Sequence, residues 1–91
     1  MLEAFVLVET RLGMADEVAH RFEQVEEIIH ADVVTGCYDI LVRVRAWSLE
    51  SLGEVVAAMK SVDGVTRALA CPVEHPAPAA HRGWQPIHAA V

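Results

Sequence analysis

The stretch that decides the fold is residues 33–45, which read VVTGCYDILVRVR. It predicts the end of one β-strand, a reversal at Gly36, and a second strand from about Tyr38 to Ala46. Glycine suits the reversal because it adopts positive φ without a Cβ penalty. Along the second strand, successive side chains point to opposite faces. One set is Ile40, Val42, Val44 and Ala46, and the other set is Asp39, Leu41, Arg43 and Arg45.

Two segments of the chain have the apolar spacing of an amphipathic helix. Each places apolar residues at i, i+3, i+4 and i+7, which forms one stripe on a helix. The first stripe is Ala15, Val18, Ala19 and Phe22, and the second is Leu52, Val55, Val56 and Met59. Ser48 is expected to be the N-cap of the second helix.

Three further strands complete the predicted order. Residues 3–10 are apolar on both faces, which favours a central strand. Residues 27–35 predict a second strand with Ile29, Ala31 and Val33 on one face, and residues 65–73 a fourth. The order β-α-β-β-α-β is that of the ferredoxin-like fold, with a four-stranded antiparallel sheet and both helices on one face.

This architecture leaves the other face of the sheet bare. Phe5 or Val6, together with Ile28, Val34 and Leu41, must include residues of that face. Leaving several such side chains in water would cost several kcal/mol at about 25 cal/mol per Å². The hydrophobic fraction of 54% is also high for a chain of 91 residues. A small domain buries a smaller share of its surface than a large one, so the surplus apolar residues favour self-association. We therefore expect at least a dimer, with two sheets packed face to face.

Composition limits the class of protein. The chain fits one domain, residues 1–74, followed by a Pro-, Ala- and His-containing tail, residues 75–91, in which Trp84 and Ile87 could dock on a neighbouring subunit. The formal charge is −6, and the basic residues are scattered, which argues against direct nucleic-acid binding. No signal peptide or membrane-spanning run is present, so a cytoplasmic location with free Cys37 and Cys71 is expected.

The chain resembles the effector-binding (RAM) domain of the Lrp/AsnC regulators. The resemblance covers Phe5 to about Val73, and its strongest marks are Val34-Thr35-Gly36-x-Tyr38-Asp39 and Asp63-Gly64-Val65-Thr66. It implies a dimeric α/β barrel, rings of dimers such as octamers, and an amino-acid effector bound at contacts between dimers. Members of the family carry a DNA-binding helix-turn-helix before this domain, and none fits here, so the sequence resembles the stand-alone form.

The resemblance also implies a ligand site at residues Thr35, Gly36, Cys37, Tyr38 and Asp39. Backbone N–H groups around Gly36 would bind the α-carboxylate of the effector, and Asp39 would face its α-ammonium group. Thr35 and Tyr38 would line the pocket. The alternative for Tyr38 and Asp39 is a purely structural turn, because Asp accepts backbone hydrogen bonds in turns.

Other candidate sites have simpler explanations. Arg43 and Arg45 could bind an anion, or they could pair with carboxylates such as Glu9 or Asp32. The five histidines, His20, His30, His75, His81 and His88, lack the spacing of metal ligands. We expect no metal, no cofactor and no catalytic residues, because no nucleophile motif is present.

The sequence thus favours a non-enzymatic, amino-acid-sensing module that modulates a full-length Lrp/AsnC regulator. Two alternatives stay open. One is a small cofactor-free monooxygenase on a dimeric α+β barrel, which needs a roomy cavity between helices and sheet. The other is an ACT-like amino-acid-binding domain, whose glycine-rich first turn is poorly matched by Arg11-Leu12-Gly13-Met14.

Overall fold

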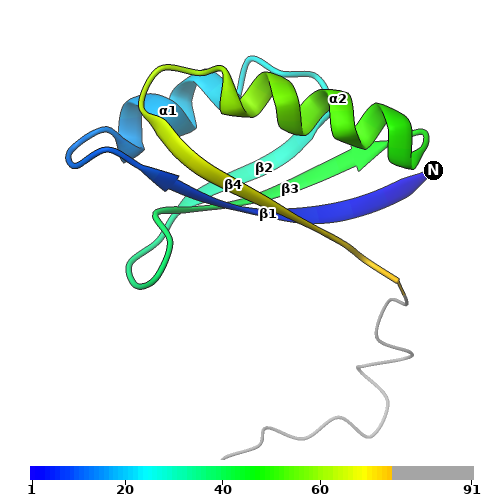
Figure 1. Cartoon of the computed structure of the whole chain (residues 1–91), viewed down its shortest axis with the longest axis horizontal. Coiled ribbons are helices and arrows are strands. Elements are labelled where there is room, and N and C mark those ends of the chain that lie inside the picture. The colour runs from blue at the N-terminus through cyan, green and yellow to red at the C-terminus, as the bar shows by residue number, and fades with distance from the viewer. Residues whose placement is uncertain (75–91) are drawn as a thin grey trace, which may run out of the picture.

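A computed structural model describes residues 1–74 of the chain (Figure 1). The expected tail, residues 75–91, and its docking residues Trp84 and Ile87 lie outside the described residues. Six elements follow one another: β1 (Leu2–Thr10), α1 (Ala15–Phe22), β2 (Ile28–Val33), β3 (Ile40–Ala46), α2 (Leu49–Lys60) and β4 (Val65–Pro72). The predicted order β-α-β-β-α-β is therefore confirmed.

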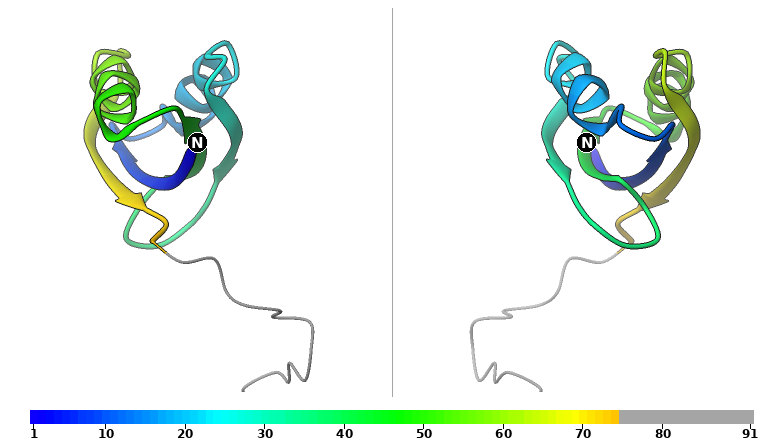
Figure 2. Two further views of the ribbon diagram at one scale, coloured as in Figure 1. Left: turned by 90° about the vertical axis from the view of Figure 1, so that its right-hand side faces the viewer. Right: turned by 90° about the vertical axis from the view of Figure 1, so that its left-hand side faces the viewer.

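The four strands form one antiparallel sheet in the order β2-β3-β1-β4. β1 is central, as its two apolar faces predicted. Both helices lie on the same face of the curved sheet, and the other face is bare (Figure 2). This arrangement confirms the ferredoxin-like fold.

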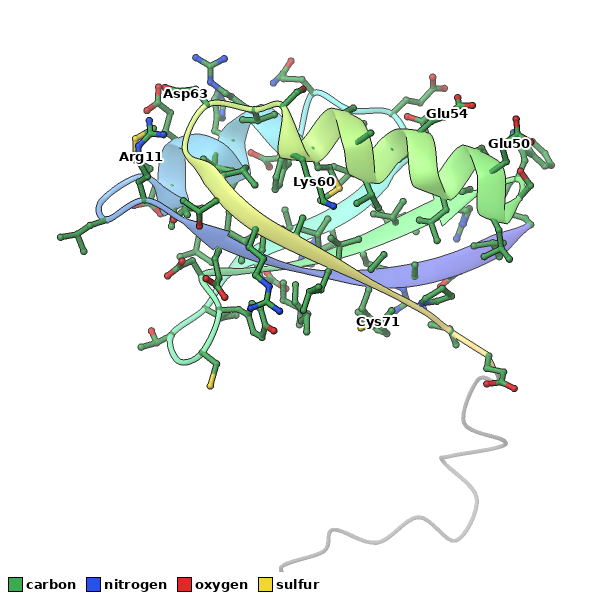
Figure 3. The ribbon with its side chains drawn as sticks, in the orientation of Figure 1. Arg11, Glu50, Glu54, Lys60, Asp63 and Cys71 are labelled. Carbon is green, nitrogen blue, oxygen red and sulfur yellow. The ribbon has the colours of Figure 1, made fainter. Side chains whose placement is uncertain are left out.

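Hydrogen bonds hold the chain at both ends of α2. Ser48 is the N-cap, as predicted: the N–H of Ser51 donates to the Ser48 hydroxyl at 3.1 Å, and the Ser48 N–H donates to the Ser51 hydroxyl at 2.9 Å. After α2, Arg11 donates to Asp63 at 2.9 Å, which joins the turn after β1 to the turn before β4 (Figure 3). The Arg11 hydrogen bond holds the pKa of Asp63 below its ordinary value of 3.8.

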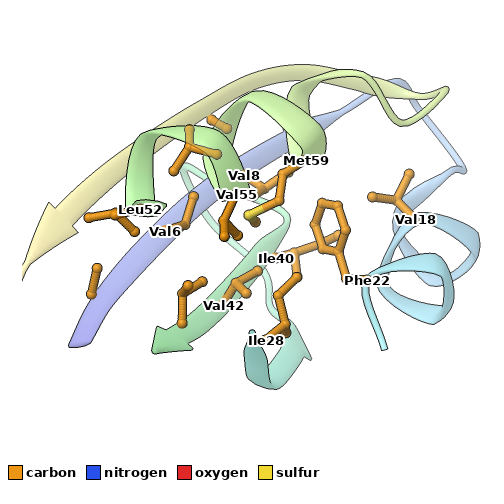
Figure 4. Packing of buried hydrophobic residues seen from close by; sticks show 14 of the residues in the cluster. Val6, Val8, Val18, Phe22, Ile28, Ile40, Val42, Leu52, Val55 and Met59 are labelled. Atoms are coloured by element: carbon orange, nitrogen blue, oxygen red, sulfur yellow. The ribbon is translucent and has the colours of Figure 1, made fainter. Parts of the chain in front are cut away.

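The core fills the space between the helices and the sheet. Fully buried side chains come from all three sides: Val6 and Val42 from the sheet, Phe22 from α1 and Met59 from α2 (Figure 4). The part of the chain that the structure describes has no buried polar or charged side chain. The predicted alternation of β3 holds, because Ile40, Val42, Val44 and Ala46 are all buried.

One expectation for β2 was wrong. Ile29 was assigned to the same face as Ala31 and Val33, and Ile28 to the bare face. Instead Ile28 is 9% exposed and belongs to the core, whereas Ile29 is 46% exposed. The reason is a register shift between Ile28 and His30 in the pairing with β3, which inserts an extra residue and reverses the faces.

Candidate functional site

The connection between β2 and β3, residues 34–39, projects from one end of the sheet on the side away from the helices (Figure 1). It is longer than predicted, because β2 ends at Val33 and β3 begins at Ile40. The Val34 N–H donates to the Asp39 carbonyl at 2.8 Å and closes the base of the loop. Gly36 has φ +139°, a conformation that favours glycine. All five predicted ligand-binding residues therefore belong to one glycine turn.

Asp39 joins this loop to β1. Its N–H donates to the Val8 carbonyl at 2.8 Å, and its Oδ2 accepts a hydrogen bond from the Thr10 N–H at 2.8 Å. The side chain is half-buried. One carboxylate oxygen thus has a structural role, and its partner lies 29 positions away in β1 rather than in the turn itself. Among residues 1–74, no donor contacts the other oxygen, Oδ1.

The rest of the loop faces solvent in a single copy. Thr35, Gly36 and Cys37 are exposed, and Tyr38 is half-buried. Within residues 1–74, the N–H groups from Thr35 to Tyr38 donate to no protein acceptor. The loop therefore offers unpaired backbone donors beside one carboxylate oxygen, and one copy of the chain does not enclose them.

The bare face carries apolar side chains at its centre. Phe5 is 37% exposed and Leu69 is 36% exposed. Leu7 pairs with Leu41 on one side and with Leu69 on the other, and Leu7 and Leu41 are half-buried. Phe5 and Leu41, together with residues of β2, line a shallow hollow of about 340 Å³. The expectation of an apolar bare face is correct for Phe5 and Leu41. Of the alternatives Phe5 and Val6, Val6 is the one in the core, and the expectation was wrong for Ile28, which also belongs to the core.

Arginine–carboxylate pairs flank these apolar residues. Arg43 Nε donates to Glu3 Oε1 at 2.9 Å, and Arg45 Nη2 lies 3.4 Å from Glu3 Oε2. The Arg43 hydrogen bond and the charge of both guanidinium groups hold the pKa of Glu3 below its ordinary value of 4.5. The Arg43 guanidinium also lies 5.5 Å from the centre of the Phe5 ring. Both arginines are therefore already paired.

Arg43 and Arg45 were predicted to pair with carboxylates such as Glu9 or Asp32, but their partner is Glu3. Glu3 lies directly opposite Arg45 in the register of β1 and β3. The expected partners are used elsewhere, since Asp32 lies 2.9 Å from His30, and Glu9 lies 3.8 Å from Arg67.

The remaining polar groups do not assemble into a site. No group of three or more His, Cys, Asp or Glu side chains within residues 1–74 could hold a metal ion. His20 and His30 are exposed and lie beside Glu23 and Asp32, and the other histidines lie outside the described residues. Cys37 and Cys71 are exposed free thiols. In the described part of the chain, every helix is too short or too polar to cross a bilayer.

Known proteins resemble this chain in sequence and in fold. The family described as the Lrp/AsnC ligand binding domain matches residues 3–73. The HTH-type transcriptional regulator FL11 of Pyrococcus furiosus is 32% identical over 62 residues, which are 68% of this chain and 41% of the relative. The chain thus spans less than half the length of the curated relatives that it matches.

Two solved structures extend the comparison. The structure of TTHA0845 from Thermus thermophilus superposes with a TM-score of 0.80 at 28% identity, over 86% of this chain and 99% of that one. The feast or famine regulatory protein Rv3291c of M. tuberculosis, complexed with L-methionine, superposes with a TM-score of 0.72 at 23% identity, over 84% of this chain and 52% of that one. At that identity, the second likeness concerns the fold alone.

Proposed function

Because the chain belongs to the Lrp/AsnC ligand-binding domain family, we propose that it is an oligomeric amino-acid-sensing module of a transcription-regulating system. In this proposal the domain of residues 1–74 binds the effector and acts on a full-length Lrp/AsnC regulator. The observation that carries the proposal is the glycine turn of residues 34–39, with unpaired N–H groups beside Asp39. Rv3291c, a protein of the same fold, was solved with L-methionine, and we propose the same class of ligand for this chain.

The chemistry of the turn matches the two ends of a free amino acid. An α-carboxylate and an α-ammonium group are separated by one carbon, so a site for both must present donors and an acceptor within one turn. The N–H groups of Gly36, Cys37 and Tyr38 would donate to the carboxylate, and Asp39 Oδ1 would accept from the ammonium. Hydrogen bonds to charged groups are among the stronger ones. Thr35 and Tyr38 would line the side-chain pocket.

A second copy would complete the site. The bare face would pack against the bare face of a second chain, because its apolar side chains gain from leaving water. The loop projects on that same side of the sheet, so assembly would carry it toward neighbouring copies. A dimer, and a ring of dimers such as an octamer, would enclose the exposed residues Thr35 and Cys37.

The proposed mechanism is a shift between assembly states. A ligand held between copies binds one arrangement more tightly than another, and that difference in affinity favours the arrangement. No catalytic step is needed. A cofactor-free enzyme on this fold would need a cavity between the helices and the sheet, and that space is filled by Phe22, Met59 and Ile40, all fully buried.

A thermal-shift screen of the twenty amino acids, with light scattering on the same samples, tests the proposal. We expect one or a few amino acids to raise the melting temperature and to change the particle mass. Asp39→Asn should abolish that response, because the amide has no negative charge to bind the ammonium group. The amide oxygen can still accept the hydrogen bond from the Thr10 N–H, so the loop should keep its contact with β1. Asp16→Asn, which removes an exposed charge on α1, is the matched control. A flat response to all amino acids would contradict the proposal.

A further inference from the structure

One end of the sheet carries an apolar surface that neither the core nor the proposed ligand site uses. Trp47, which follows β3, is 79% exposed, Met1 is 65% exposed and Ile29 is 46% exposed. These three residues, here called the Trp47 surface, line a hollow of about 330 Å³. Tryptophan is enriched where protein surfaces bind one another. An indole this exposed therefore indicates a binding surface.

The charges around the Trp47 surface favour a basic partner. Glu26 and Glu27 line the same hollow. Arg45 lines the hollow too, and it lies 3.4 Å from Glu3, a carboxylate that it shares with Arg43. Within residues 1–74, neither Glu26 nor Glu27 forms an ion pair, so both carboxylates can accept a cation from a partner.

The C-terminal segment, residues 75–91, starts beside this surface. Val73 N–H donates to the Glu3 carbonyl at 2.9 Å, so the chain leaves β4 next to the start of β1. Leu2 pairs with Ala46, which places Trp47 at the end of the sheet where the N-terminus lies, and the left view of Figure 2 looks onto that end. Only β1 lies between β4 and β3, so the two are about 10 Å apart, two strand spacings.

The composition of residues 75–91, HPAPAAHRGWQPIHAAV, complements the Trp47 surface. It offers one indole, Trp84, two residues beyond Arg82, which is the only charged side chain of the segment. Trp84 is the tenth residue after Glu74, and an extended chain of ten residues spans up to about 33–36 Å. Trp84 can therefore reach the hollow of its own chain with length to spare.

We propose that residues 75–91 bind the Trp47 surface of the same chain, with Trp84 in the hollow and Arg82 beside Glu26 and Glu27. Because residues 75–91 are covalently joined to β4, their binding to the Trp47 surface is intramolecular, which favours the contact. Prolines in the segment reduce the conformational freedom lost on binding. The bound segment covers the apolar end of the sheet and borders the bare face, because Ile29 lines the hollows of both.

The two tryptophans of the chain, Trp47 and Trp84, provide the test. Trp84→Phe and Trp84→Ser each leave Trp47 as the only tryptophan, and they differ in whether the segment keeps an aromatic side chain. We expect Trp47 in Trp84→Phe to emit at shorter wavelength, and acrylamide to quench it about half as strongly or less, because a packed indole is shielded from solvent. Equal quenching in the two variants, whether strong or weak, overturns the proposal.

The reciprocal variants are Trp47→Phe and Trp47→Ser, in which Trp84 is the only tryptophan. Acrylamide should quench Trp84 less strongly in Trp47→Phe than in Trp47→Ser. Failure of this second pair also overturns the proposal.

Two further experiments test the role of charge and whether the contact forms within one chain. In the Trp84→Phe background, replacing Glu26 and Glu27 by Lys should restore strong quenching, because Lys repels Arg82. Replacing Asp16 and Glu17 of α1 by Lys makes the same charge change away from the surface and should leave quenching unchanged. Protection should also persist on dilution. If it falls with protein concentration, the segment of a second copy is the occupant, and the same-chain contact is refuted.

Discussion

Replacing Asp39 by Ala or by Asn should separate two roles of one carboxylate. Its Oδ2 accepts from the Thr10 N–H at 2.8 Å and so fastens the loop to the end of β1. Its Oδ1 is the proposed acceptor for the effector. Asp39→Ala removes both functions. Asp39→Asn keeps an acceptor for Thr10 and removes the charge.

The expected magnitudes follow from that single hydrogen bond. A bond to a charged group contributes about 1.5–3 kcal/mol, and the lower end applies here because Asp39 is half-buried. A loss of about 1.5 kcal/mol lowers the melting temperature of a domain of this size by about 6–12 °C. Asp39→Asn should lose less than about 0.5 kcal/mol, or under about 4 °C.

Thermal and urea unfolding, at one protein concentration for all variants, measure these differences. The same samples, titrated with the amino acid that stabilises the wild type most, report the second role: both variants should lose that stabilisation. If Asp39→Asn destabilises the chain as much as Asp39→Ala, the bond to Thr10 does not act as described. If Asp39→Asn responds to the effector like the wild type, its charge is not part of the site.

Four other variants test the fold and the bare face. Leu41→Asp should weaken self-association at least about 100-fold in sedimentation, because an unpaired buried carboxylate costs about 3–5 kcal/mol. Gly64→Ala should destabilise the chain by about 1–3 kcal/mol in urea unfolding, since its Cβ would lie 2.8 Å from the Met14 side chain at φ +102°. Gly53→Ala, in the open middle of α2, should stabilise it by about 0.5–1 kcal/mol. Asp63→Asn should reduce the loss of stability in acid: the lowered pKa of Asp63 contributes stability above its ordinary value of 3.8, and this is lost as pH falls through the folded value.

Each of these expectations has an outcome that would contradict it. A Leu41→Asp chain that associates like the wild type would remove the bare face from the interface. Equal stability of Gly64→Ala and Gly53→Ala would mean that the close approach of Gly64 to α1 does not constrain the fold. Parallel pH curves for wild type and Asp63→Asn would mean that the Arg11 pair does not favour the folded state.

The elements were predictable because their patterns are local. The alternation from Ile40 to Ala46 and the helical stripe ending at Phe22 each follow from residues close in sequence, and both were confirmed. Ile28 and Ile29 were assigned to the wrong faces because their orientation depends on the register shift against β3. That shift is a property of the pairing between two strands, which the residues of β2 do not specify on their own.

The same distinction applies to the site. Thr35 to Asp39 were expected to lie together because they are consecutive, and the positive φ of Gly36 follows from the turn. The bond from Thr10 to Asp39 was not predicted, because it requires the end of β1 beside the loop, 29 residues away in sequence. The pairing of Arg43 with Glu3, rather than Glu9, likewise needed the register of β1 and β3.

Hydrogen exchange of the assembled protein, with and without the stabilising amino acid, tests the central claim most directly. If the turn binds an α-carboxylate, saturating effector should slow exchange at the N–H groups of Gly36, Cys37 and Tyr38, which have no protein acceptor in residues 1–74. Asp39→Asn should show no such protection under the same conditions. Unchanged exchange across residues 34–39, with protection only elsewhere in the chain, would contradict the account.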